Sequence, residues 1–319
     1  MRLPALAFSS VAAAVLLMVA ASIPPVMARW AVPAVLTGLL LIFAWGWPRL
    51  LGAPSRRSLS ATIAVPAVVV VWAVTLLEDR WNFSNEVMLG DRPDLWLAPV
   101  AAATALGTMV GFVVQVLRGQ GRPFRLESTA STVTGVAIGT SASAWALLIR
   151  TQTDAVTAWF ETGADLGALT PTGGVSEIPV LTVSLLAGTV AAALIGLLPT
   201  TLPVRVFVMV VVAGALPLGV YSGLNQGEIH YVATLAVAGV LSGALVGLIR
   251  AAVEQEQDMQ AMTLIDDAST LVTDEPLTAE AASGARRGEL IATLSLGAAP
   301  VLVSGMVLYF TLWVVPPLG

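Results

Sequence analysis

The sequence contains no cysteine and no lysine, and it has a single histidine, His230. Without cysteine, the chain cannot form disulfide bonds, thiolate metal sites or a cysteine nucleophile. One histidine also excludes a metal site built from several histidines of the same chain. We therefore expect no bound metal and no other cofactor.

Charged residues are also scarce. They make up only 11% of the 319 residues, whereas ordinary soluble domains carry about 25%. Hydrophobic residues make up 57%, and the mean hydropathy is +0.87. Such a chain cannot cover a surface that faces water, so we predict that the lipid bilayer surrounds it. The formal net charge of −5 argues against nucleic acid as a partner.

Long apolar runs account for most of the chain. A bilayer core about 30 Å thick requires about 20 apolar residues per helix. Nine stretches meet this need, near residues 4–22, 30–47, 60–77, 95–117, 130–149, 179–198, 204–221, 229–249 and 290–314. The predicted fold is therefore all-α, a polytopic integral membrane bundle of about nine transmembrane helices.

The arginines predict the orientation of this bundle. With the N-terminus inside and the C-terminus outside, eleven of the fifteen arginines fall on the inner side and four on the outer side. Basic residues resist translocation, so this orientation is the favoured one. The all-arginine, alanine- and valine-rich composition is typical of a bacterial protein. We expect a multi-pass location in the bacterial inner (plasma) membrane.

The first apolar run has two interpretations. Residues 1–28 end in Val-Met-Ala and resemble a signal peptide with a small-residue cleavage site. The run is long for that role, however, and Pro24 and Pro25 are typical of a tight turn between two spans. A retained helix is favoured, and cleavage would leave eight helices in the same orientation.

Three regions follow from this pattern. Residues 1–249 contain the first eight spans, residues 250–289 form an acidic cytoplasmic segment, and residues 290–319 contain the last span. The acidic segment holds nine acids and three arginines, and its later part has the composition of a flexible linker. It is either a solvated connector or a docking site for a protein partner.

Small residues repeat along several spans. Gly239, Gly243 and Gly247 form a ladder with a spacing of four, and Gly188 and Gly196 lie in a similar run. Residues 187–197 and 238–248 agree at six of eleven positions, which suggests either an internal repeat or a chance match. Such ladders let two helix backbones approach closely, so we predict a helix-packing seam.

The fifth predicted span is the most polar. Thr132, Gly135, Gly139 and Ser143 fall on one of its sides at helical spacing. The stripe is a candidate substrate path, and the alternative interpretation is a hydrogen-bonded seam between helices.

Ionisable groups are absent from the middle of every predicted span. Ion-coupled carriers usually keep such a group at membrane depth. The nearest titratable pair, Glu228 and His230, lies at a predicted outer interface, where a solvated helix end is the simpler interpretation.

Familiar catalytic motifs are also missing, which makes an enzyme the third choice. We expect a permease-like protein or the membrane subunit of a transport complex that handles a small or lipidic substrate. The alternative is a non-catalytic scaffold or assembly factor for cell-envelope machinery.

Overall fold

The computed structural model describes residues 3–21, 23, 25–51, 56–76, 93–117, 125–148, 177–224, 231–268 and 279–314. These residues form nine helices and no strand. The helices are α1 (Leu3–Ala21), α2 (Pro25–Leu50), α3 (Arg56–Leu76), α4 (Pro93–Leu117), α5 (Arg125–Ser141), α7 (Glu177–Ile195), α8 (Leu202–Leu224), α9 (Val232–Ala268) and α10 (Ala279–Val314). Each predicted apolar stretch overlaps one of them, although the bounds differ, as for 130–149 and α5.

Six of these helices are long and apolar enough to cross a membrane: α2, α3, α4, α8, α9 and α10. α1 and α7 contain shorter apolar stretches, Phe8–Ala21 and Val180–Ile195. α5 is the least apolar because hydroxyl side chains occur along its whole length. The prediction of an all-α membrane protein is confirmed at this level, with six helices rather than nine meeting the length and composition expected of a span.

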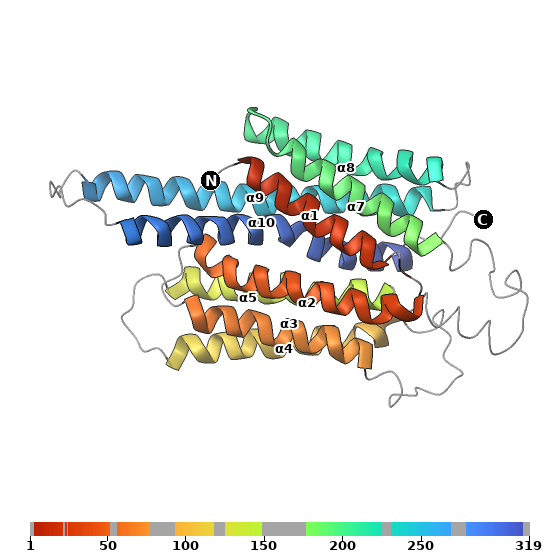
Figure 1. The fold of residues 1–319 in the computed structure, drawn as a ribbon, viewed down its shortest axis with the longest axis horizontal. Coiled ribbons are helices and arrows are strands. Elements are labelled where there is room, and N and C mark those ends of the chain that lie inside the picture. Colours follow the sequence, from red (N-terminus) through yellow and green to blue (C-terminus); the bar gives the residue numbers. More distant parts are fainter. Residues whose placement is uncertain are drawn as a thin grey trace, which may run out of the picture.

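The helices run roughly parallel or antiparallel to one another and form two groups (Figure 1). α2, α3, α4 and α5 pack together on one side, and α7, α8 and α9 pack together on the other. α1 and α10 lie between the groups, because α10 contacts α2 and α5 as well as α7 and α9. The last helix of the chain is therefore at the centre of the fold.

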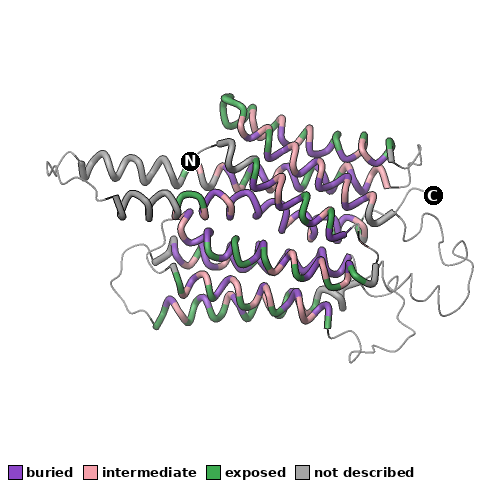
Figure 2. The backbone as a smooth tube through the Cα atoms, viewed as in Figure 1, coloured by how far each residue is buried: buried purple, intermediate pink, exposed green. Residues whose placement is uncertain are grey.

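The largest buried cluster lies where these central helices meet α2, α3 and α5 (Figure 2). α1 is an integral part of it, since Ala13, Ala14 and Leu17 are almost fully buried. The Ser9 hydroxyl of α1 also donates a hydrogen bond to the Thr293 carbonyl of α10, at 3.3 Å. Removal of this helix would expose one side of α10.

α9 and α10 extend beyond the other helices at one end of the bundle (Figure 1). The membrane-compatible part of α9 is Val232–Ala251, so residues 252–268 continue the helix for about 25 Å. α10 begins at Ala279, inside the stretch whose composition predicted a flexible linker. Alanine, glutamate and arginine favour helix there, and the preceding Pro276 does not interrupt it.

Candidate functional site

The polar stripe of α5 is buried inside the bundle. Thr132 is 1% exposed and Ser143 is fully buried. A methyl group on Gly135 would lie 2.5 Å from the Ile63 side chain of α3, and one on Gly139 would lie 3.0 Å from Ala67. The four residues proposed as a substrate path thus lie against neighbouring side chains, as expected of the alternative packing interpretation.

The hydroxyls of this stripe are used within α5 itself. Thr132 donates to the Ser128 carbonyl at 2.6 Å, and Ser143 donates to the Thr140 carbonyl at 2.7 Å. Thr140 donates to the Val136 carbonyl and also shares a 2.7 Å hydrogen bond with Thr104 of α4. Only the last of these bonds joins two helices.

A regular packing pattern joins α3, α4 and α5. A methyl group on Gly107 of α4 would lie 2.9 Å from Pro66 of α3 and 2.8 Å from Val136 of α5. One turn along, a methyl group on Gly111 of α4 would lie 2.9 Å from Thr132 of α5. Glycine on α4 therefore accommodates bulky or hydroxyl-bearing side chains from two neighbouring helices.

α5 is interrupted near its buried end. Its first helical stretch ends at Ser141, and residues 143–148 are helical again. At the break, the Ala142 amide bonds to the Gly139 carbonyl and the Trp145 amide to the Ala142 carbonyl, so each bond spans three residues instead of four. The Ser141 hydroxyl donates to the Ile138 carbonyl at 2.6 Å, and this satisfies a group that the break leaves without its helical donor.

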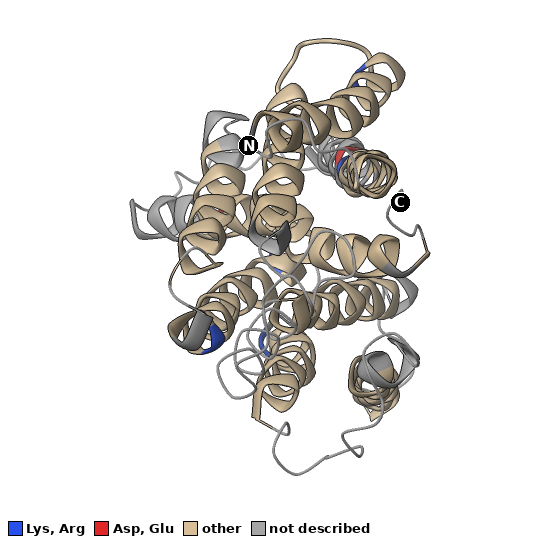
Figure 3. Cartoon of the chain, turned by 90° about the vertical axis from the view of Figure 1, so that its right-hand side faces the viewer, with Lys and Arg blue, Asp and Glu red and all other residues tan. Residues whose placement is uncertain are grey.

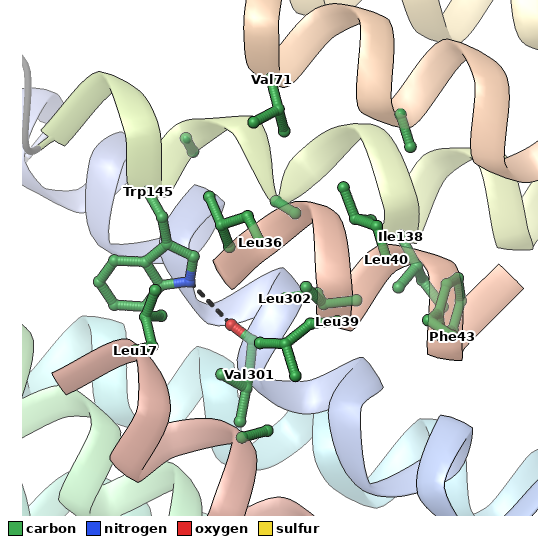
Figure 4. Close-up of a cluster of buried hydrophobic side chains, with 14 of the residues drawn as sticks. Leu17, Leu36, Leu39, Leu40, Phe43, Val71, Ile138, Trp145, Val301 and Leu302 are labelled. Atoms are coloured by element: carbon green, nitrogen blue, oxygen red, sulfur yellow. Dashed lines mark hydrogen bonds between the residues drawn. The ribbon is translucent and has the colours of Figure 1, made fainter. Parts of the chain in front are cut away.

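α10 lies directly beside this interruption. The indole N–H of Trp145 donates to the Val301 carbonyl at 2.8 Å, next to Pro300 (Figure 4). Gly305 of α10 leaves room for the Trp145 ring, because a methyl group there would lie 2.6 Å from it. A broken helix and a proline-containing helix thus meet deep in the bundle, where tryptophan links their backbones.

The glycine ladder of α9 lies against the backbone of α8. A methyl group on Gly239 would overlap the Ala213 carbonyl oxygen, and one on Gly243 would lie 2.9 Å from the Met209 carbonyl oxygen. On Gly247 it would lie 3.0 Å from the Val206 side chain. The predicted helix-packing seam therefore corresponds to close contact along about two turns of α8.

Gly188, the related glycine of α7, also lies against the Ala213 carbonyl of α8. A methyl group on Gly188 would lie 2.9 Å from the Ala213 carbonyl oxygen and 2.5 Å from the Pro217 ring. Pro217 has no N–H, so the Ala213 carbonyl lacks its usual helical donor. Gly188 and Gly239 are equivalent in the two self-similar fragments.

A charged cluster lies at one end of the α7–α8–α9 group. Arg250 of α9 is 6% exposed and donates to the Ala193 carbonyl in the last turn of α7, at 3.1 Å. Its guanidinium occupies the space that a side chain at Gly196 would need. Arg205 of α8 pairs with Glu254 of α9 at 2.6 Å. Arg250 thus stabilises the C-terminal end of α7 and fixes it to α9.

This cluster was not among the residues identified from the sequence. One signal in the sequence pointed to it, since Arg250 and Glu254 are four residues apart and share a helical face. The third member, Arg205, belongs to another helix, and no local pattern relates it to them. Glycine at position 196 was predicted to pack helices, whereas it accommodates a guanidinium.

Other candidate residues fall outside this description. Glu228 and His230 are not among the described residues. Within the described part of the chain, acidic and histidine side chains form no cluster suited to a metal ion. Figure 3 shows how few of the described residues are charged.

The fold and its composition define a class: an all-helical membrane protein with a closely packed interior. The chain matches no protein-family model, no curated protein and no solved structure.

Proposed function

We propose that this protein is a non-catalytic scaffold subunit in a bacterial inner membrane, serving envelope or transport machinery. The close packing of the α5 stripe is the main support. This polar helix face, the candidate for a substrate path, lies against α3 and α4 at residues that are almost fully buried. A filled interior suits a protein that holds others in place.

The projecting ends of α9 and α10 provide the docking element in this proposal. They extend beyond the bundle, and their connecting region is rich in acidic residues. We place this end in the cytoplasm, with nine spans, an inner N-terminus and an outer C-terminus, on the basis of the arginine distribution. An acidic segment is poorly suited to anionic lipid, so the partner proposed here is a protein.

Cysteine labelling tests the filled interior, because the natural chain has no cysteine and gives no background. Thr132→Cys and Ser143→Cys replace buried hydroxyls with groups of similar size. In membrane vesicles we expect a small water-soluble thiol reagent to leave both unlabelled and to label Thr200→Cys, an exposed position in the turn before α8. Labelling of 132 and 143 at the rate of 200 would contradict the scaffold proposal.

A photo-crosslinking residue at position 257, on the projecting part of α9, tests docking. In native membranes, we expect a discrete adduct of fixed mass from position 257 and none from exposed Leu106 on α4. Equal, diffuse adducts from the two positions would contradict a docking element at the end of α9.

A permease is the second candidate, and one observation favours it. The interruption of α5 beside Pro300 of α10 lies deep in the bundle. Discontinuous helices at membrane depth are typical of transporter substrate sites. If the protein transports, labelling of Ser143→Cys should appear only when substrate is present or a gradient is applied.

A further inference from the structure

An apolar groove of about 540 Å³ runs along the outer side of α3 and α4. Its floor includes Pro66 of α3 and Gly107 of α4, the pair that brings the two helices together. Its walls carry Val65 and Val69 on one side and Leu106 on the other, and each of these is about 60% exposed. Because α3 and α4 are both of membrane-spanning length and composition, the groove opens toward the hydrocarbon of the bilayer.

The shape of the groove limits what fits in it. It extends from Ala61 to Ala73, twelve residues or about 18 Å along the helix axis. Its lining is apolar apart from Thr62, which suits a hydrocarbon occupant. The length is close to the about 15 Å of one leaflet, as expected for a single acyl chain.

A positive charge lies beyond one end of the groove. Along α3, the groove is lined by pairs of adjacent residues, and successive pairs are one turn apart. In each pair the first residue is exposed and the second is more buried. Ala61 and Thr62 form the first pair. Arg57 and Ser58 continue the pattern by one turn, and Arg57 is exposed. This places the α-carbon of Arg57 about 6 Å beyond the groove along the helix axis. Side chains on a helix lean toward its N-terminus, so the exposed Arg57 side chain extends away from the groove toward the headgroups.

We propose that this groove binds one acyl chain of a phospholipid whose headgroup phosphate is held by Arg57. Arginine suits the phosphate because its planar guanidinium donates two parallel hydrogen bonds to phosphate oxygens. The apolar walls accept the chain, and the groove ends before it crosses both leaflets. The site depends only on the membrane location of α3 and α4, so it holds whether the protein anchors partners or transports a substrate.

Photolabelling tests the site directly. The protein is reconstituted in phosphatidylcholine vesicles doped with a phosphatidylglycerol that bears a diazirine at the end of one acyl chain. After illumination and proteolysis, we expect adducts concentrated in residues 61–76 and 99–110. Adducts spread evenly over all lipid-facing helices would overturn the proposal.

Two matched alanines on α4 provide the variant and its control. Ala102 lines the groove, and Ala105 is equally exposed but does not line it. Ala102→Phe should strongly lower labelling of the groove, because the phenyl ring would occupy the space of the acyl chain. Ala105→Phe should leave labelling unchanged. Ala61→Phe, on the opposite wall, repeats the test if Ala102→Phe lowers thermal stability.

The headgroup contact has its own test. Arg57→Gln should lower groove labelling by phosphatidylglycerol about fivefold, as expected for one basic residue near a membrane surface. Arg57→Lys should restore most of it. Unchanged labelling in Arg57→Gln would exclude a phosphate at this position. Protein–protein adducts at residues 61–76, together with a dimer by native mass spectrometry, would show that a second copy covers the groove instead.

Discussion

The two helix groups of this protein achieve close packing by different means. In the α3–α4–α5 group, glycines on α4 accommodate proline, threonine and valine side chains from the neighbouring helices. In the α7–α8–α9 group, glycines on two helices contact the backbone of a third. A side chain can shift slightly when a neighbour grows, whereas a backbone carbonyl moves only with its helix. The second group should therefore be the less tolerant of substitution.

Gly239→Ala should give the largest effect, because the added methyl group would overlap the Ala213 carbonyl oxygen. We expect a loss of about 2–3 kcal/mol in the free energy of unfolding, at the upper end for an overpacked core. Thermal unfolding in detergent measures it. Gly107→Ala in the other group should cost less, since Pro66 and Val136 contact that position through side chains. An equal cost would remove the distinction between the two groups.

Arg250→Met should cause the second-largest loss of stability. It keeps the apolar stem but leaves the Ala193 carbonyl at the end of α7 without its donor. An unsatisfied buried carbonyl costs about 1–3 kcal/mol, and we expect a decrease in thermal stability of that order. Arg205→Met is the control, because its partner Glu254 is 39% exposed and an exposed ion pair contributes about 0–1 kcal/mol. A larger loss of stability for Arg205→Met would show that the Arg205–Glu254 ion pair contributes more to stability than the hydrogen bond from Arg250 to Ala193.

Thr104→Val should be milder. It removes the 2.7 Å hydrogen bond to Thr140, the contact by which these hydroxyls join α4 to α5. Bonds of this kind between membrane helices contribute about 0.6 kcal/mol on average. Thr104→Val and Thr140→Val should each lower stability slightly, and the double variant should lose less than the sum. Additive losses would mean that the two hydroxyls act independently.

Gly219→Ala is expected to have the smallest effect and the opposite sign. This glycine lies in α8 two residues after Pro217, and no atom lies within 4 Å of a methyl group there. Alanine is a better helix former by about 1 kcal/mol, so stability should be unchanged or slightly higher. A marked loss at position 219 would show that α8 is crowded along its whole length, rather than only where α7 and α9 approach it.

The helices were predictable from the sequence because each depends on a long local run of apolar residues. The positions of the glycine seams were predictable for the same reason, since a spacing of four defines one face of a helix. The residues that pack against those faces were not predictable. Nothing near Gly196 in the sequence indicates that an arginine 54 residues later lies against it. The α5 stripe shows the same limit, because a polar face looks alike whether water or another helix lies beside it.

The helical start of α10 was missed for a different reason. Its composition, acidic and rich in alanine, is compatible with both a linker and a helix. The break in α5 at Ser141 has no proline to mark it, and glycines like the nearby Gly139 also occur in unbroken helices of this chain, so only the hydrogen-bond pattern reveals it. At the break, α10 packs directly against α5 through Trp145, a contact that the local sequence does not indicate.

The unbroken length of α9 has a mechanical consequence. The helix contains no proline and extends over 37 residues, about 55 Å. Its membrane part is fixed to α8 through Gly239 and Gly243 and to α7 through Arg250, while its far end projects beyond the bundle. α9 therefore has a held part and a projecting arm, and the boundary between them lies near Arg250. A small sideways force on the projecting arm becomes a torque on the glycine contacts, so a tilt of that arm is transmitted to α8.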